Sequence, residues 1–331
     1  MRLTLLVPVY NDWTALGQLL EDLNRELFRA NRRASVLIVD DGSSTPAPDS
    51  TFDLIRPNGI TSVEILHLRR NVGHQRAIAI GLAYVEAHCR PDAVVVMDGD
   101  GEDRPEDVHR LVTALEQQGA TRIVFAERTR RSEGFAFAVL YWLYRTIHLL
   151  LTGERVRVGN FSVIPSTLLH RLVAISDLWN HFAAAVFHAR IPYDSIPTVR
   201  GRRYAGQSQM SFVALVTHGL SAMSVFGDRI GVRMLLVTCA WTLVTLAGAS
   251  CTVLWHVATA TPLPAWFPYA GVALLMFVFL AFTVSLAFVF SILSSRRNIG
   301  FLPHREYEHY VSHVDSVPMT YLHVQQPLYR H

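Results

Sequence analysis

The stretch AVVVMDGDGEDRPED, residues 93–107, runs from an apolar segment directly into a cluster of carboxylates. Valines favour an extended strand, and Pro105 suits the first turn of a helix, so the stretch predicts a strand, an acidic loop and a helix. Asp98 and Asp100, separated by Gly99, stand at the expected strand end. The stretch therefore predicts an α/β fold and a site where this strand ends.

The same alternation of strand and helix runs through the first 130 residues. It predicts a mostly parallel sheet with helices on both faces, in which ligands bind beyond the carboxyl ends of the strands. No GxGxxG follows the first strand and no GxxxxGK[ST] occurs, which argues against a dinucleotide or P-loop site. The expected strands are Leu3–Val9, Val36–Val39, Val63–Leu68, Ala93–Met97 and Arg122–Ala126, and the expected helices are Trp13–Arg29, Gln75–Ala87 and Pro105–Gln117.

The second half of the chain has a different composition. No Lys, Arg, Asp or Glu occurs between Arg233 and Arg296. The two apolar runs there, residues 234–257 and 269–293, each exceed the roughly 20 residues that span a bilayer. Two buried core helices are the alternative, but soluble helices rarely stay apolar all round. We expect a catalytic domain over 1–210, an amphipathic interfacial segment over 211–232, a transmembrane hairpin over 233–295 and a tail over 296–331.

Arginines flank the hairpin on one side. Arg229 and Arg233 precede the first run, Arg296 and Arg297 follow the second, and the loop between the runs carries no charge. Positive flanks stay in the cytoplasm. The catalytic domain and both termini are therefore expected to be cytoplasmic.

The acid pair fits a metal site. Asp98 and Asp100 can approach a hard divalent cation together, with Glu102 as a third oxygen ligand, and Mg²⁺ or Mn²⁺ held in this way keeps positions open for phosphate oxygens. An EF-hand loop begun at Asp98 fails, because its sixth residue would be Asp103 and its twelfth His109. A solvated acidic turn stays open, since two acids alone are a weak motif.

Four segments, VPVYND (7–12), VDDGSS (39–44), RNVGHQRAIAIGL (70–82) and MDGDGEDRPED (97–107), resemble the inverting family 2 glycosyltransferases of GT-A fold. With the C-terminal hairpin, residues 1 to about 297 resemble the polyprenyl-phosphate glycosyltransferases, the group of dolichol-phosphate mannose synthase and its bacterial two-span relatives. The resemblance implies transfer of a sugar from a nucleotide sugar to an undecaprenyl-type phosphate. The product would be a lipid-linked sugar donor for the cell envelope, made at the bacterial inner membrane.

The resemblance also implies roles for single residues. Asp98 and Asp100 would bind Mg²⁺ or Mn²⁺ with Glu102, and Arg128 would contact the sugar diphosphate. Asp12 stands where the family has Glu. Tyr10 as strand-end packing and Asp41 as a turn residue are the plainer alternatives. The residues that would bind the nucleotide sugar are Pro8, Tyr10, Asp12, Asp40, Asp41, Gln75, Asp98 and Gly99.

Arginines are also assigned to the lipid phosphate. All 30 basic residues are Arg, so a side-chain cation that holds an anion must be Arg or His. RGRRYAGQSQMSF (200–212) resembles the family's R-x-x-G-x-S-K segment through Arg203 and Ser208, with Gln209 in place of lysine. Arg131 precedes the amphipathic stretch 135–151, and Arg145 lies within it. The stretch is either an interfacial helix or a partly buried helix with a solvated face.

The acceptor chemistry requires no strong base, because a polyprenyl phosphate is ionised at neutral pH. UDP is favoured over GDP as the nucleotide, and the sugar and a homo-oligomeric state stay open; no nucleic-acid partner is expected. A processive polysaccharide synthase would need a Q/R-x-x-R-W segment, which is absent. Two alternatives remain: a membrane-bound family 2 enzyme with another acceptor, and a catalytically decayed membrane scaffold. The scaffold is an alternative because Asp12, Asn160 and Gln209 depart from the residues that the family has at these positions.

Overall fold

The computed structural model describes residues 1–48, 51–52, 58–128, 145–154, 158–206, 212–260, 262, 264–295 and 301–318. The chain forms two compact units. The first is an α/β unit of Met1–Ala138, Val156–Val225 and Phe301–His331. The second is a helical unit of Val139–Arg155 and Phe226–Gly300.

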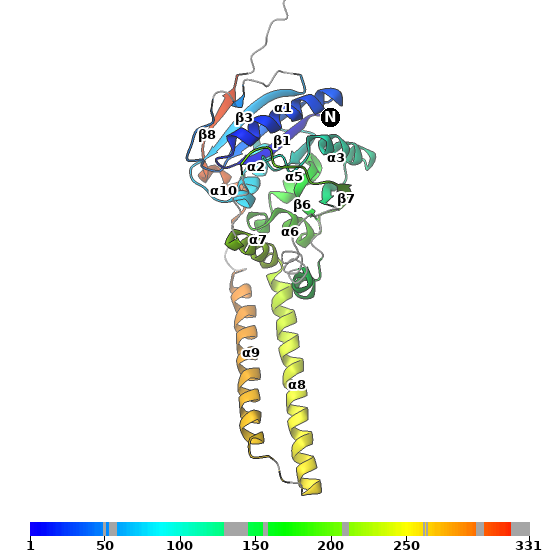
Figure 1. Cartoon of the computed structure of the whole chain (residues 1–331), viewed down its shortest axis with the longest axis vertical. Helices are drawn as coiled ribbons and strands as arrows, with labels where there is room; N and C mark the ends of the chain where they lie inside the picture. Colours follow the sequence, from blue (N-terminus) through cyan, green and yellow to red (C-terminus); the bar gives the residue numbers. More distant parts are fainter. Residues whose placement is uncertain are drawn as a thin grey trace, which may run out of the picture. The chain divides into compact units, whose positions relative to one another are not determined.

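The strands described in the α/β unit form one eight-stranded sheet in the order β7-β5-β6-β4-β1-β2-β3-β8 (Figure 1). Strands β1 to β4 run parallel to one another, as do β5 and β7, whereas β6 and β8 pair antiparallel with their neighbours. The strands are β1 (Leu3–Val9), β2 (Ala34–Asp40), β3 (Ile60–Leu68), β4 (Ala93–Val96), β5 (Ile123–Arg128), β6 (Val158–Pro165), β7 (Tyr193–Thr198) and β8 (Val311–Val317).

Helices cover both faces of this sheet because successive side chains of a strand point to opposite faces. Leu5 and Val7 pack under α1 (Trp13–Arg29) and α3 (Pro105–Gln117). Leu6, between them, packs in the other core, with α2 (His74–His88), α5 (Ser166–Leu172) and α6 (Phe182–His188). The predicted α/β class is confirmed. The same unit also contains the helices η2 (Ser176–Trp179) and α7 (Phe212–Ser224).

The carboxyl ends of β1, β2 and β4 meet at one edge, because these strands are parallel and adjacent. The turn after β2 depends on Gly42, whose φ is +68°. A Cβ atom there would lie 2.5 Å from the backbone of Arg70. Glycine therefore lets the acidic end of β2 lie close to the loop that follows β3.

The tail contributes to the sheet, whereas the sequence indicated only an extension. Strand β8 pairs antiparallel with β3, preceded by α10 (Pro303–Glu306) and η3 (Tyr307–His309). Tyr307 is buried in the core beside α2, where its hydroxyl lies 2.9 Å from His88 Nε2. The side chains of β8 are largely exposed, so backbone pairing, which leaves no apolar periodicity in the sequence, holds this edge strand.

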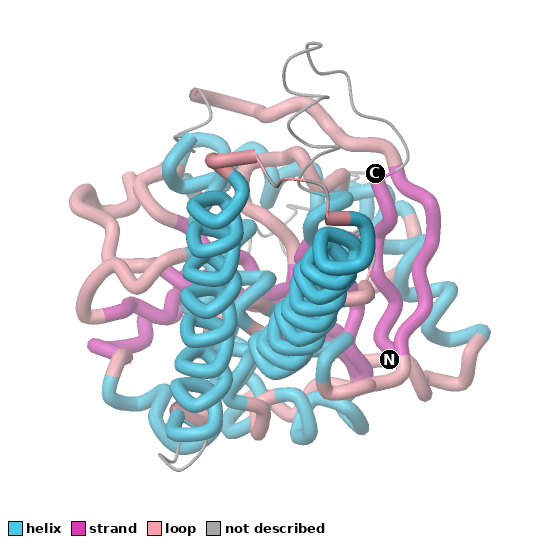
Figure 2. The backbone as a smooth tube through the Cα atoms, turned by 90° about the horizontal axis from the view of Figure 1, so that it is seen from below, coloured by secondary structure: helices cyan, strands magenta, loops and turns pink. Residues whose placement is uncertain are grey.

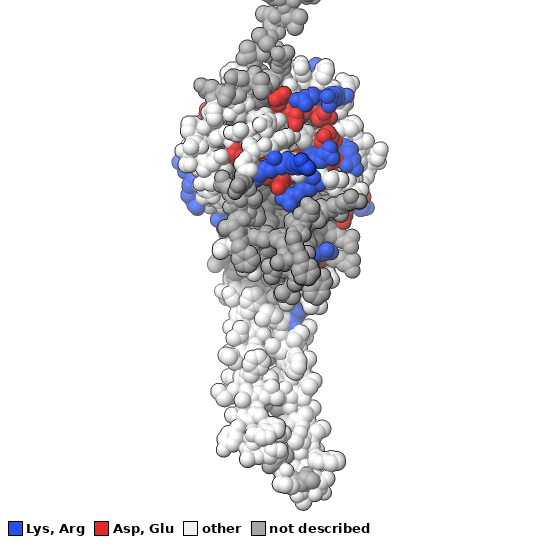
Figure 3. Space-filling view, viewed as in Figure 1, with Lys and Arg blue, Asp and Glu red and all other residues white. Residues whose placement is uncertain are grey.

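The helical unit contains α8 (Gly227–Thr259) and α9 (Phe267–Ser295), which pack side by side (Figures 1 and 2). Both helices extend beyond the predicted runs 234–257 and 269–293. They are long and apolar enough to cross a membrane. Figure 3 shows charged side chains concentrated on the α/β unit and an almost uncharged surface along the two helices.

Contacts within the helical unit engage the arginines at the start of α8. Arg229 Nη1 lies 2.9 Å from Glu154 Oε1, and Arg233 Nη1 donates to the carbonyl of Leu150 at 2.8 Å. Leu150 lies in the last turn of a short helical segment, residues 145–152, where carbonyls lack helical partners. These arginines are therefore held by the segment that precedes them in the same unit.

Candidate active site

The acidic loop after β4 is held by its own side chains. The N–H of Asp98 donates to Asp103 Oδ2 at 3.0 Å, and the N–H of Glu102 donates to Asp100 Oδ1 at 2.9 Å. Gly101 has φ +86°, which glycine adopts without strain. The loop therefore presents Asp98 and Asp100 at the carboxyl edge of the sheet, as the sequence predicted.

A second segment, residues 200–206, lies over this loop; we call it the arginine strap. The N–H groups of Gly201 and Tyr204 donate to the carbonyls of Glu102 at 2.8 Å and Asp100 at 3.0 Å. The Tyr204 ring lies where a side chain at Gly101 would be, and its hydroxyl donates to Asp22 Oδ2 at 2.6 Å. The strap is thus anchored both to the acidic loop and to α1.

The strap supplies the cations that face these acids. Arg203 Nη1 donates to Asp100 Oδ2 at 3.0 Å, while its Nη2 forms an ion pair with Asp12. Arg200 pairs in the same way with Glu102, its Nε lying 2.9 Å from Oε2. One guanidinium therefore joins the end of β1 to the end of β4.

The charge on Asp100 is only partly compensated. Burial, followed by the nearby negative charge of Asp98, raises the pKa of Asp100, although Arg203 acts in the opposite direction. A divalent cation would stabilise both ionised carboxylates, and their hard oxygens suit Mg²⁺ or Mn²⁺. The residues therefore fit such an ion. Arg200 pairs with Oε2 of Glu102, so Glu102 could join as a third ligand through its other oxygen.

His74 is a site residue that sequence reasoning missed. Its Nε2 lies 3.1 Å from Asp98 Oδ1 and 3.0 Å from the side-chain nitrogen of Asn160. Loss of hydration lowers the pKa of His74, but Asp98, Asp103 and Asp41 together raise it above its ordinary value. Histidine at the start of α2 therefore provides Asp98 with a partner that can carry positive charge.

Gln75, predicted to bind the nucleotide sugar, has both polar atoms engaged within the protein. Its Nε2 donates to Asn160 Oδ1 at 3.0 Å, and its Oε1 accepts from the N–H of Phe182 at 2.8 Å. This buried side chain joins α2, β6 and α6. In this arrangement Gln75 positions Asn160, which in turn touches His74.

The two acids at the end of β2 are held by backbone groups. Asp41 accepts from the N–H groups of Val72 at 2.7 Å and Gly73 at 2.9 Å, and burial raises its pKa to about 6. Asp40 accepts from the N–H of Ser43 at 2.9 Å. Its second oxygen lies 2.9 Å from Nδ1 of His67 on β3. Both carboxylates are nearly fully buried and fixed in orientation.

The remaining predicted residues are distributed more widely. Pro8 lies in β1, beside the backbone of Gly99, and the exposed Tyr10 follows that strand. Arg128 is the last residue of β5. Arg145 is exposed in the helical unit. Arg131, Ser208 and Gln209 lie outside the described residues. Among the predicted residues, the structure thus brings Arg203 into contact with Asp12 and Asp100, with Asp98 and Glu102 in the same acidic loop as Asp100.

Comparison with known proteins gives the chain a family. Residues 4–173 match the family model described as glycosyl transferase family 2. The uncharacterized glycosyltransferase YkcC of Bacillus subtilis (strain 168) is 22% identical over 238 residues, which is 69% of each chain. An undecaprenyl-phosphate 4-deoxy-4-formamido-L-arabinose transferase of Enterobacter sp. (strain 638) is 27% identical over 253 residues, 70% of this chain and 72% of that protein.

Solved structures give weaker matches. Glucosyl-3-phosphoglycerate synthase from Mycobacterium tuberculosis, crystallised with Mn²⁺, UDP-glucose and phosphoglyceric acid, matches with a TM-score of 0.49 at 15% identity, over 70% of this chain and 80% of that one. A Pyrobaculum calidifontis mannosyltransferase in complex with GDP-mannose and Mn²⁺ has a TM-score of 0.44 at 15% identity, over 93% and 78%. The family match covers more than half of this chain, which therefore belongs to glycosyl transferase family 2.

Proposed function

We propose that this chain transfers a sugar from a nucleotide sugar to an undecaprenyl-type phosphate, with inversion at the anomeric carbon. The observation that carries the proposal is Arg203, which lies between Asp12 and Asp100 at the carboxyl edge of the sheet. The acids are suited to a metal ion, and the arginine between them is suited to a diphosphate. The two apolar helices of the same chain suit a lipid acceptor. The name of the Enterobacter relative supports the same acceptor.

Asp98 and Asp100 would hold Mg²⁺ or Mn²⁺. When bound, such an ion neutralises charge that develops on the leaving diphosphate. A metal ion on Asp100 would compete with Arg203 for this carboxylate, and a guanidinium released in this way would be available to a phosphate, where charge-assisted bonds are strong. The strap would thus change partners from carboxylate to phosphate. This extends the role in lipid-phosphate binding that the sequence predicts for Arg203.

Binding and orientation are left to the other residues. Asp40 and Asp41 offer fixed, buried carboxylates for the hydroxyl and N–H donors of a ribose and base, and the exposed Tyr10 lies at the end of the neighbouring strand. The acceptor phosphate is ionised at neutral pH, so alignment of the two substrates supplies much of the rate. We assign no residue to proton abstraction. UDP is proposed as the nucleotide.

Transfer into lipid tests the proposal. The purified chain would receive radiolabelled UDP- and GDP-sugars, Mn²⁺ and undecaprenyl phosphate, and the products would be extracted into organic solvent. Label in a lipid that depends on both undecaprenyl phosphate and the metal is expected. Label in a polymer would indicate a processive synthase. No transfer from any donor, with intact binding to membranes, would favour a scaffold.

Labelling of single cysteines tests the proposed orientation. With Cys89, Cys239 and Cys251 replaced, a cysteine at Ala265, between the two apolar helices, should react with an impermeant reagent added outside cells. A cysteine at Ser43, in the α/β unit, should react only after the membrane is opened. The reverse pattern would overturn a cytoplasmic catalytic domain.

A further inference from the structure

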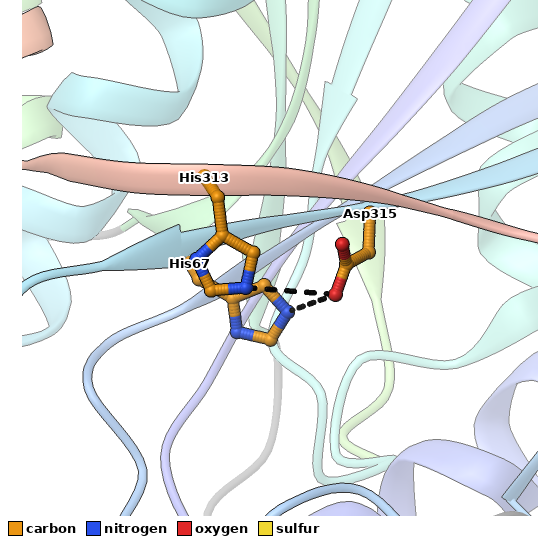
Figure 4. A group of neighbouring side chains, drawn as sticks. All are labelled: His67, His313 and Asp315. Atoms are coloured by element: carbon orange, nitrogen blue, oxygen red, sulfur yellow. Dashed lines mark ion pairs between the residues drawn. The ribbon is translucent and has the colours of Figure 1, made fainter.

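Two histidines and an aspartate gather where the tail joins the sheet, outside the acidic loop (Figure 4). His67 on β3 is the direct cross-strand partner of His313 on β8, and Asp315 lies two residues along on the same face of β8. One nitrogen of each imidazole and one oxygen of Asp315 lie within 4.8 Å of one another. We propose that these three side chains bind a transition-metal ion of the zinc type.

The separations of the ligand atoms suit this ion. His67 Nε2 lies 3.4 Å, and His313 Nε2 3.6 Å, from Asp315 Oδ2. Ligands about 2.05 Å from a tetrahedral zinc ion lie about 3.4 Å apart. The imidazole rings are stacked with an angle of 13° between their planes, so one ring must turn before both lone pairs converge. His313, with 57% of its side chain exposed, has the freedom to do so.

The hydrogen bond to Asp40 prepares His67 as a ligand. An ionised carboxylate has no hydrogen to donate, so the 2.9 Å contact requires a hydrogen on His67 Nδ1. In neutral His67 the lone pair is then on Nε2, directed at Asp315. A lone pair that faces a carboxylate is repulsive unless a proton or a metal ion lies between them. Carboxylate, histidine and metal in this sequence form the arrangement in which metal-binding histidines are commonly oriented.

The donor set selects the kind of metal. Two imidazole nitrogens and one carboxylate suit Zn²⁺ and its neighbours in the first transition row, whereas Mg²⁺ prefers oxygen ligands. The site thus differs in chemistry from Asp98 and Asp100. It would also join the tail to Asp40, so that metal binding stabilises β8 and orients a carboxylate at the carboxyl edge.

Cobalt absorption separates the two sites. Full-length, tag-free protein in detergent would be titrated with Co²⁺ alone, because a tetrahedral site with nitrogen ligands absorbs strongly in the visible range and an octahedral oxygen site only weakly. A strong band that Zn²⁺ abolishes is expected. His313→Ala and Asp315→Asn should each remove the band and weaken Zn²⁺ binding in equilibrium dialysis by at least about tenfold, since even partners outside the ligand set are worth roughly that much.

His309→Ala is the matched control, because His309 is an exposed histidine of the same tail outside the cluster. It should keep both the band and the Zn²⁺ affinity. Because there are two cluster variants, His313→Ala and Asp315→Asn, a folding defect in one of them still leaves the other to test the proposal. The proposal is overturned if the wild-type protein gives only weak octahedral absorption. It is also overturned if either folded cluster variant binds Zn²⁺ as the wild type does, since His67 and Asp315 then share only a proton.

Discussion

Two pairs of carboxylates lie at the same edge of the sheet, yet the protein holds them differently. Asp98 and Asp100, after β4, pair with the side chains of His74 and Arg203, and Asp100 also accepts from the backbone N–H of Glu102. Asp40 and Asp41, after β2, accept hydrogen bonds mainly from backbone N–H groups that cannot leave without unfolding. The difference indicates a division of work. We propose that the first pair exchanges its cation for a metal ion and that the second is preorganised for one ligand orientation.

Removal of Asp100 tests the exchangeable pair most severely. Asp100→Ala should lower transfer on the order of a thousandfold or more, because stabilisation of the developing charge is lost. Metal-dependent nucleotide binding should fall with it, while folding and membrane insertion persist. Steady-state transfer and nucleotide binding with and without EDTA are the measurements. Glu106→Gln, which changes a half-exposed carboxylate on α3, should leave both unchanged. Full wild-type activity in EDTA would contradict the metal role.

Removal of Arg203 should move two quantities in opposite directions. Arg203→Ala takes away the cation that competes for Asp100, so Mn²⁺ alone should bind more tightly. The lost charge-assisted contact to phosphate, worth roughly 1.5–3 kcal/mol, should raise the KM for polyprenyl phosphate about ten- to a hundredfold. Calorimetry and transfer kinetics measure the two effects.

The exposed neighbour Arg202 provides the matched variant for this test. Arg202→Ala should change neither quantity by more than a factor of about two, as expected for a surface charge. Unchanged Mn²⁺ affinity in Arg203→Ala would show that Arg203 does not compete with the metal. A loss of nucleotide binding with an unchanged lipid KM would assign the strap to the donor instead.

The pH dependence of the unfolding free energy tests the second pair, Asp40 and Asp41. The difference between a pKa of about 6 and the ordinary 3.8 of Asp41 corresponds to roughly 3 kcal/mol between its two protonation states. Because the folded pKa is the higher one, this contribution is complete below about pH 4 and is lost as the pH rises through 6. Asp41→Asn should therefore flatten the fall in unfolding free energy between pH 4 and 6. Asp92→Asn, at an exposed aspartate, should retain the wild-type slope in the same urea titrations.

The sequence predicted the helices and strands that are determined by patterns of neighbouring residues. The strand at Leu3–Val9 and the helices at Trp13–Arg29 and Pro105–Gln117 match the structure residue for residue, because apolar periodicity and a first-turn proline mark them. The sequence did not predict the edge strand β8, since backbone pairing with β3 leaves no pattern of buried side chains. The pairing of Arg203 with Asp12 spans 191 residues. Only the fold brings such residues together.

Tyr204 tests the anchoring of the strap on a smaller scale. Its hydroxyl donates to Asp22, and its ring covers Gly101, so Tyr204→Phe removes the hydrogen bond and keeps the packing. The loss should cost about 1 kcal/mol of unfolding free energy. A double-mutant cycle with Asp22→Asn should give a coupling of the same size, since the two groups are in direct contact. If the strap exchanges partners, the loss of this hydrogen bond should speed amide hydrogen exchange over residues 200–206. The exchange rates of the residues around Asp41 should stay unchanged. Equal exchange in both loops would erase the difference between the two carboxylate pairs.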